Sequence, residues 1–528
     1  MRLAPLFALL LAACATTPEP PTAAERAERW WGDVSTLAAE GMEGRLTGTA
    51  GYQRAADYVV SQLKEIGLGP AGTAGFFQPV EFEEQFVDPA GSTAALVAGG
   101  RETALTIPGD IIIGRGDGRR PERIEAPLVF VGYGLHMPEA GHDDFAGIDL
   151  KGKIAVVVSG GPADVSGALK AHARRDRARI LSERGAAGLL ALTTAKAVEV
   201  PWARSMAQAG QSGMYFADRA LRDVKSEFFN ASFNTETSEK LFAASGRTFA
   251  EISALADSSK PLPRFDMKQS LRATVAMRHR PVTSSNVVAR LPGSDPGLKA
   301  EHVVFSAHLD HLGVSTPIAG DGLYNGAMDN AAGVAGLLDI ARSYKARRVK
   351  PKRSMLFVFV TAEEKGLLGS RYFALRPSVP KASMVANMNF DMALPIMPLK
   401  SVIALGAEES SLGAMAAAVG ESMGLPLVPD PFPDRNSFVR SDQYSFIREG
   451  VPALAFKFGF GPKYPEAEIE RQWRSTRYHA PSDDLSQPVA KEDAIRLHDF
   501  VGELALRVAN APERPTWGGE SFFRRFAK

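Results

Sequence analysis

The sequence predicts an α/β protein with a mostly parallel central sheet flanked by helices, into which a smaller β-rich module is inserted. The chain has 528 residues, too many for one ordinary hydrophobic core, so at least two domains are expected. From about residue 284, near-continuous apolar runs alternate with helical patterns, which is typical of a buried parallel sheet. Between about 96 and 275 the apolar runs are short and helices are fewer, which indicates a separate module.

The N-terminus has the composition of an export signal. Residues 1–13 contain one Arg and then mostly apolar and small residues, and they are too short to span a membrane. The only cysteine of the chain, Cys14, follows directly, an arrangement that resembles the signal of bacterial lipoproteins. That resemblance implies cleavage before Cys14, a lipid on its sulfur and a tether over 14–23. The alternative is an ordinary signal peptide that contains a cysteine.

Ala15 follows the cysteine in place of an Asp. By the same resemblance, the absence of Asp implies an outer-membrane protein that faces the periplasm of a Gram-negative bacterium. The 61 basic and 60 acidic residues nearly cancel, so bulk charge gives no indication of a nucleic-acid partner. No later stretch approaches the ~20 apolar residues of a membrane span.

Residues 24–95 are predicted to form the first part of the α/β domain. Helical patterns cover about 24–40 and 53–68, and the second helix should end at Gly67 or Gly69. The β-rich module is assigned to 96–275. Its expected elements are strands over 127–135 and 153–160, a helix with a Gly stop over 177–192, and a helix near 236–257.

Residues 276–515 are predicted to form the second part of the α/β domain, before a C-terminal tail over 516–528. Strands are expected over 302–308, 354–364, 383–392, 400–409 and 451–459, with helices over 331–346, 411–424 and 490–508. In such a sheet, the chemistry lies at the carboxyl ends of the strands.

Metal-binding side chains follow several of these strands. His308 ends the first strand, Glu363 and Glu364 end the second, and Asp391 ends the third. Asp329 lies in a loop that contains Gly and Asn just before a helix, and His479 lies in a distant loop. Each feature alone is weak, because a strand-end His is often structural and a Glu pair often begins a solvated helix. Their common position at strand ends makes the joint pattern much stronger.

Counted as ligands, His308, Asp329, Glu364, Asp391 and His479 are enough for two metals if Asp329 bridges them. Each metal then has one His, one terminal carboxylate and the shared Asp, with a position left open, as catalytic zinc requires. Nitrogen and carboxylate ligands without thiolate favour two Zn²⁺ ions, and Co²⁺ or Mn²⁺ would also fit. A carboxylate two residues after a ligand His, here Asp310, can lie within reach of its ring.

Six motifs together resemble the di-zinc aminopeptidase family of zinc exopeptidases, which includes bacterial secreted aminopeptidases and, more distantly, the transferrin receptor and glutamate carboxypeptidases. The motifs are "SAHLDHLG", "YNGAMDNAAG", "VTAEEKGLLGSRYF", "NMNFDM", "RSDQYSF" and "YHAPSDD". The resemblance covers roughly 285–505 and a segment near the start, and the middle resembles an inserted protease-associated domain.

The resemblance implies a role for each matching residue. His308 and Asp391 would bind one zinc, Glu364 and His479 the other, and Asp329 would bridge them. Glu363 would be the general base, and Asp310 would orient His308.

Other matches are less specific. Tyr478 would stabilise an oxyanion or simply stack beside the site, and Ser441 and Asp442 would line the substrate pocket. His311 has no ligand position left and is expected to be structural or to contact a ligand residue.

The expected activity is removal of N-terminal residues from peptides. A carboxypeptidase stays open, since Arg435 or Arg440 could bind a substrate carboxylate. A glutaminyl cyclase with one zinc and a non-catalytic, receptor-like binding protein are less consistent with the complete ligand set.

Overall fold

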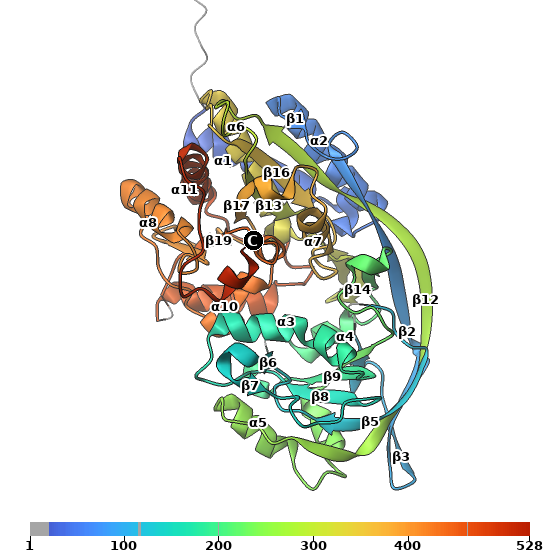
Figure 1. The fold of residues 1–528 in the computed structure, drawn as a ribbon. Coiled ribbons are helices and arrows are strands. Elements are labelled where there is room, and N and C mark those ends of the chain that lie inside the picture. The colour runs from blue at the N-terminus through green and yellow to red at the C-terminus, as the bar shows by residue number, and fades with distance from the viewer. Residues whose placement is uncertain (1–20, 115–117, 199, 462, 528) are drawn as a thin grey trace, which may run out of the picture.

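The computed structural model describes residues 21–114, 118–198, 200–461 and 463–527 (Figure 1). The signal peptide, Cys14 and most of the tether therefore lie outside the described residues. Within the described part, no helix is both long and apolar enough to cross a membrane.

Four parallel strands form the centre of the large domain. They are β16 (Ser354–Val360), β13 (His302–His308), β17 (Met384–Asn389) and β19 (Ala453–Phe458), adjacent in that order. Antiparallel strands β12 (Phe265–Leu291) and β18 (Val402–Leu405) flank them. Every residue of β13, β16 and β17 is buried, as expected for a sheet covered on both faces. The predicted α/β fold with a mostly parallel sheet flanked by helices is confirmed.

Helices cover both faces of this sheet. One face packs against α1 (Ala23–Leu37), α2 (Ala50–Ile66), α6 (Ala332–Ala346), α8 (Leu412–Met423) and α11 (Lys491–Asn510), whose apolar sides share one core with the strands. The other face packs against α7 (Leu368–Leu375) and α9 (Gln443–Ile447). Of the two predicted stops for α2, the structure uses Gly67, which adopts the left-handed conformation at φ 79°.

Two long strands connect the large domain to the inserted module. β2 (Phe77–Ala98) pairs with β12 along nearly its whole length, and both run down one side of the molecule (Figure 1). The expected boundaries at 95/96 and 275/276 fall inside these continuous strands. The module is therefore attached by paired strands, which hold it more firmly than single-chain linkers would.

The module continues the sheet of the large domain, because its first parallel strand pairs with β12, but it has a core of its own. Its strands β5 (Arg123–Phe130), β8 (Ile154–Val158), β9 (Gly188–Leu192) and β11 (Phe229–Phe233) are parallel, and β4 (Ile111–Ile113) is antiparallel at the edge. Its helices are α3 (Gly167–Glu183), α4 (Trp202–Ala207) and α5 (Phe249–Asp257). The remaining elements of the chain are β1 (Gly69–Pro70), β3 (Arg101–Leu105), β6 (His136–Met137), β7 (His142–Asp143), β10 (Gly213–Phe216), β14 (Gly313–Ile318), β15 (Asp321–Tyr324) and α10 (Pro465–Thr476).

Two predicted helices of the module differ in the structure. The helix expected over 177–192 ends at Glu183, and the apolar residues after Gly185 form strand β9. The helix expected near 236–257 is a 3₁₀ segment over 235–241 followed by α5. Thr248 begins α5 with a capping box, in which it exchanges hydrogen bonds with Glu251, so a new helix starts where one continuous helix was expected.

Candidate active site

The predicted metal ligands meet at the carboxyl ends of the parallel strands. His308 is the last residue of β13, and Glu363, Glu364 and Asp391 follow β16 and β17. Asp329 lies in the irregular turn before α6, and His479 follows α10. These residues line a cavity of about 240 Å³.

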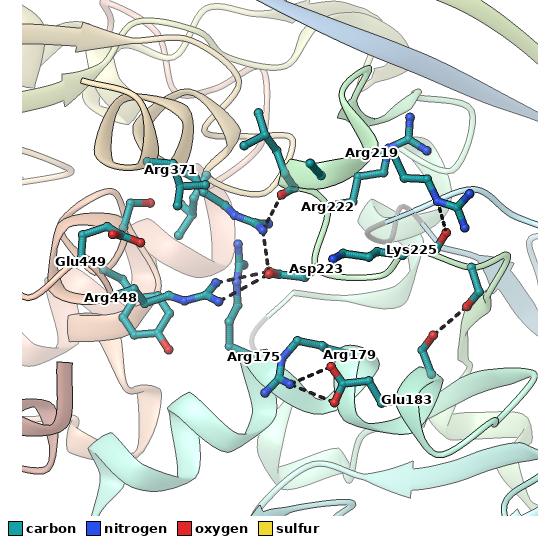
Figure 2. Close-up of a pocket in the computed structure, with 18 residues that line it drawn as sticks. Arg175, Arg179, Glu183, Arg219, Arg222, Asp223, Lys225, Arg371, Arg448 and Glu449 are labelled. Carbon is teal, nitrogen blue, oxygen red and sulfur yellow. Dashed lines mark hydrogen bonds and ion pairs between the residues drawn. The ribbon is translucent and has the colours of Figure 1, made fainter. Parts of the chain in front are cut away.

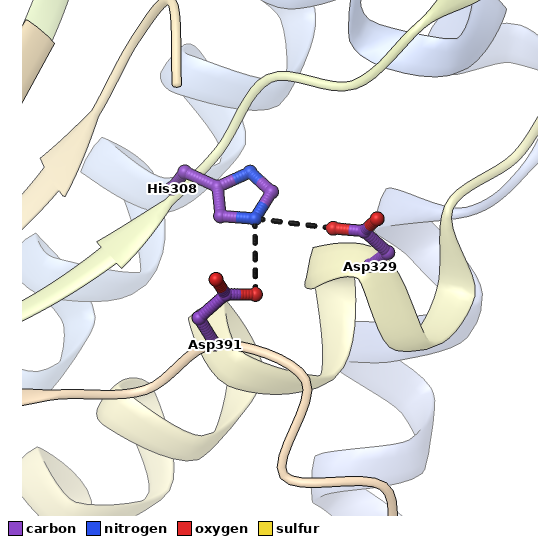
Figure 3. Close-up of side chains that lie close together, drawn as sticks. All are labelled: His308, Asp329 and Asp391. Carbon is purple, nitrogen blue, oxygen red and sulfur yellow. Dashed lines mark hydrogen bonds and ion pairs between the residues drawn. The ribbon is translucent and has the colours of Figure 1, made fainter. Parts of the chain in front are cut away.

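His308, Asp329 and Asp391 form the first group (Figure 3). The ring Nε2 of His308 is 3.2 Å from Asp329 Oδ1 and 3.4 Å from Asp391 Oδ1. The three residues come from three separate elements of the sheet edge, and all of them are at least half-buried.

His479, Glu364 and Asp329 form the second group. His479 Nε2 is 3.3 Å from both Asp329 Oδ2 and Glu364 Oε2. The two oxygens of Asp329 therefore face different groups, as a bridging carboxylate requires. His311 lies beside this group, with its Nδ1 2.8 Å from Glu364 Oε1.

These distances fit metal ligation. Nitrogen and oxygen atoms that bind one tetrahedral zinc are about 3.3–3.6 Å apart, given bond lengths of about 2.0–2.2 Å. The spacings of 3.2–3.4 Å in both groups are close to that range. The Oδ2 atom of Asp329 is buried and accepts no hydrogen bond, so it is free to bind a cation. The shorter contact between His311 and Glu364 has the length of a hydrogen bond, which makes His311 a partner of a ligand residue.

Four carboxylates are concentrated at the predicted metal ligands, although Arg175, Arg440, Lys457 and Arg474 line the same cavity. Burial disfavours a charged His308, yet the carboxylates of Glu363, Asp329 and Asp391 raise its pKa well above the ordinary value. His479 behaves similarly: burial opposes its charge, but Glu364 and Asp329 raise its pKa to about 9. Such a concentration of carboxylates attracts cations, and bound metal ions offset the repulsion among them.

Glu363 also lines the cavity, but it belongs to neither group of predicted ligands. Burial is the largest influence on it and raises its pKa, and the negative charges of Glu364, Asp442 and Asp391 add to the increase, against the opposing effect of His308. A carboxylate with a raised pKa is a stronger base than an ordinary glutamate.

Asp310 differs from its expected role. The ring Nδ1 of His308 is 3.0 Å from the main-chain carbonyl of Asp310, so the backbone orients the imidazole. The buried carboxylate of Asp310 instead accepts hydrogen bonds from the N–H groups of Glu363 at 3.0 Å and Glu364 at 3.3 Å and from the hydroxyl of Thr47 at 3.0 Å. Its side chain therefore holds the turn that presents the two glutamates.

Two buried ionic residues that sequence analysis missed hold the Asp329 loop. The carboxylate of Asp483 accepts hydrogen bonds from the N–H groups of Met328 and Asp329, both at 3.0 Å. Arg45 donates to four carbonyl oxygens around the site, those of Leu37, Leu309, Asn325 and Gly326, at 2.7–2.9 Å. Asp483 lies inside the motif "YHAPSDD", and Arg45 lies in the similar segment near the start of the chain, in "MEGRLTGT". Most of their partners are main-chain atoms, which carry no sequence signal.

Of the two residues expected to line the substrate pocket, Ser441 and Asp442, only Ser441 does so. Ser441 lines the cavity, and its hydroxyl accepts a hydrogen bond from Asn389. Asp442 is fully buried and does not line the cavity, so its expected place in the pocket wall is corrected. Burial raises the pKa of Asp442 to about 7, which is consistent with a position behind the carboxylates.

Tyr478 stacks on the ring of His479, with 3.9 Å between ring centroids and 28° between planes. The inserted module also supports this loop. Arg204 donates to the Tyr478 carbonyl at 2.7 Å, and Gln208 donates to the His479 carbonyl at 3.0 Å. Side chains from the module thus fix the main chain of one predicted ligand.

Part of the chain is similar to known peptidases in sequence, and most of it is similar in fold. Residues 286–505 match the profile described as Peptidase family M28. A probable leucine aminopeptidase 2 from Aspergillus oryzae is 29% identical over 39% of this chain and 40% of its own length. A probable zinc metalloprotease from Pyrenophora teres f. teres is 36% identical over 21% of this chain and 23% of its own length. The chain thus aligns with less than half of either curated relative.

Among solved structures, an aminopeptidase from Aneurinibacillus sp. strain AM-1 covers 92% of this chain and 95% of its own, with a TM-score of 0.53. At 21% sequence identity, this similarity concerns the fold. The family resemblance that the motifs predicted is confirmed by the profile match, which spans all five predicted ligands. Residues 286–505 of this chain are therefore similar to peptidase family M28.

Proposed function

We propose that the chain is a di-zinc aminopeptidase. The observation that carries the proposal is that His308 and Asp391 lie on one side of Asp329 and His479 and Glu364 on the other, with Glu363 in the same cavity. His311 also lies close enough to Asp329 and Glu364 to share a metal with them. His308 and Asp391 would hold one zinc, and Glu364 and His479 the other, with Asp329 as the bridge. When bound, zinc ions polarise the substrate carbonyl and acidify water.

The protein's own residues complete the chemistry. Glu363 accepts the proton of the attacking water and donates it to the departing amine. Asp310 and Thr47 fix the turn that carries Glu363, and the carbonyl of Asp310 fixes the ring of His308. The free N-terminus of a peptide would lie near the second zinc and the neighbouring carboxylates, which favours an aminopeptidase.

Cleavage of aminoacyl-nitroanilides by the chain from Pro21 tests this proposal. Activity should vanish with a chelator and return with added zinc. Glu363→Gln should lower kcat about 10²–10⁴-fold while the zinc content stays at two per chain. An active Glu363→Gln variant, or activity that survives full metal removal, would contradict the proposal.

A carboxypeptidase is the second candidate, because Arg440 lines the cavity. The other proposed arginine, Arg435, is less suited to bind a substrate carboxylate, since it pairs with Glu470 at 2.7 Å and stacks on Phe432. Peptides with a free or an acetylated N-terminus separate the two activities: an aminopeptidase cleaves only the former.

We also propose that the protein is exported and anchored through a lipid on Cys14, in the outer membrane facing the periplasm. The position of the only cysteine directly after a signal-like segment supports this. Cys14→Ser should move the protein from the membrane fraction to the soluble fraction, and an unchanged distribution would contradict the anchor.

The role of the module, which resembles a protease-associated domain, is proposed as well: it roofs the cleft and limits access to peptides. A chain without 100–270 that folds and cleaves the same peptides equally well would contradict this role.

A further inference from the structure

A second cavity, of about 530 Å³, lies between the inserted module and the large domain (Figure 2). Helix α3 and residues 219–226 of the module form one side, and α7 and α9 of the large domain form the other. Its volume is within the range of small-ligand sites. It contains none of the predicted metal ligands.

The lining of this cavity is strongly basic. Seven lining residues are Arg or Lys and three are acidic, which leaves a net charge of four positive. The basic residues are Arg175, Arg179, Arg219, Arg222, Lys225, Arg371 and Arg448.

The three acidic residues are already engaged. Asp223 of the module lies between Arg371, at 2.6 Å, and Arg448, at 3.2 Å, and joins the two parts of the chain. Despite burial, which acts in the opposite direction, these arginines lower the pKa of Asp223. Glu183 pairs with Arg179 at 3.0 Å, and Glu449 pairs at 2.8 Å with Lys381, which lies outside the lining.

Four cations remain without a carboxylate. Among the residues that the structure describes, none offers an ion pair to Arg175, Arg219, Arg222 or Lys225. The three arginines donate only to main-chain carbonyls: Arg175 to Gly366, Arg219 to Lys225, and Arg222 to Phe216 and Ala217. Figure 2 shows Arg219, Arg222 and Lys225 gathered on one side of the cavity, with Asp223 and Arg175 beside them.

We propose that this cavity binds a small polyanion that carries phosphate or several carboxylates. Like charges held around one cavity repel each other, and an anion offsets that repulsion. Guanidinium groups suit this ligand because their planar N–H donors match phosphate and carboxylate oxygens. Since both parts of the chain line the cavity, the bound anion stabilises the junction between them.

The cavity also adjoins the candidate active site. Arg175 and Leu367 line both cavities, and the guanidinium of Arg175 donates at 2.7 Å to the carbonyl of Gly366, three residues after Glu363. A ligand that binds Arg175 therefore contacts the segment that carries the proposed base.

Calorimetric binding of pyrophosphate and, separately, of citrate to the full protein tests the proposal at constant ionic strength. Each experiment is run with zinc-loaded and with chelator-treated protein, because both anions bind metals. Saturable binding that survives metal removal, together with a raised Tm, is expected. Preference for pyrophosphate or for citrate identifies the anionic group.

The variant Arg219→Gln/Lys225→Gln should weaken binding at least about tenfold. Both side chains are exposed, so the fold should tolerate the change. The control Arg101→Gln/Lys299→Gln removes the same charges at exposed positions outside the cavity and should bind normally. Equal binding by both variants, binding that requires the metals, or no binding beyond that of chloride would overturn the proposal. Because the readout is binding to metal-free protein, it is independent of peptidase activity.

Discussion

Asp483→Asn is the sharpest test of how the chain prepares the bridging position. In the structure, one carboxylate oxygen of Asp483 accepts from the N–H of Met328 and from the amide of Gln487, and the other accepts from the N–H of Asp329. Asparagine replaces one of these oxygens by an NH₂ group. In one orientation the new NH₂ faces the N–H of Asp329, which loses its acceptor. In the other it faces the amide of Gln487, and the N–H of Met328 keeps only its 3.2 Å contact with the remaining oxygen.

The magnitude follows from that loss. A hydrogen bond to a charged acceptor contributes about 1.5–3 kcal/mol. If the Asp329 loop loses this stabilisation, zinc should bind about 10–100-fold more weakly. That is the usual effect of changing a residue that supports a metal ligand. At saturating zinc, most of the kcat should return, because Asp483 itself does not line the cavity.

A competition titration against a chromophoric chelator measures the zinc affinity, and thermal unfolding of the metal-free protein measures stability. Asp484→Asn is the matched control, since the half-buried side chain of Asp484 accepts hydrogen bonds from Ser486 and lies 3.8 Å from Arg477. Zinc affinity within twofold of the wild type would refute the reasoning, and Asp483 would then support the fold alone.

Three further predictions concern other residues. Arg45→Lys keeps the charge but cannot reach four carbonyls, so it should lower the free energy of unfolding by about 3–5 kcal/mol, measured by urea denaturation. If the ring of Tyr478 only stacks on His479, the kcat of Tyr478→Phe should stay within twofold of the wild type, whereas the kcat of Tyr478→Ala should fall at least about tenfold. A large loss of kcat in the Phe variant would indicate a catalytic hydroxyl. Burial and the nearby charge of Arg290 lower the pKa of His302 from 6.5 to about 4. As the pH falls from 6.5 to 4, the unfolded chain is therefore protonated at this residue before the folded chain is. The free energy of unfolding should fall by about 3 kcal/mol over this range. His302→Gln should reduce that loss in unfolding measured across this pH range, and an unchanged pH profile would contradict the assignment.

The sequence predicted the large domain well because its strands are long, apolar and buried on both faces. The same pattern marked His308, Glu364 and Asp391, since each is a polar residue at the end of an apolar run. The helical breaks in the module were harder to predict. A capping box at Thr248 and a strand after Gly185 depend on local hydrogen bonds and on tertiary pairing, which override the helical pattern.

The role of Asp310 could not be read from the sequence for a different reason. A His-x-Asp step is compatible with a carboxylate that contacts the imidazole and with a carbonyl that does so, and only the backbone conformation decides between them. Arg45 and Asp483 were missed because each satisfies buried main-chain groups. Such residues leave no periodic pattern, although a charged residue inside a Gly-rich turn or beside a ligand loop is the signal that could have found them.

The module is best understood as part of the active-site architecture. His479, like Asp329, does not end a strand of the sheet. It has a positive φ of 53°, which is uncommon for a residue other than glycine. Its surroundings come from both parts of the chain: Asp329 and Glu364 face its ring, while Arg204 and Gln208 of the module bind its loop. The paired strands β2 and β12 keep the module close enough to do this. Removing the module would therefore release the loop of His479 as well as open the cleft. A loss of activity in the shortened chain supports a role of the module in limiting access only if its zinc affinity, measured in parallel, is unchanged.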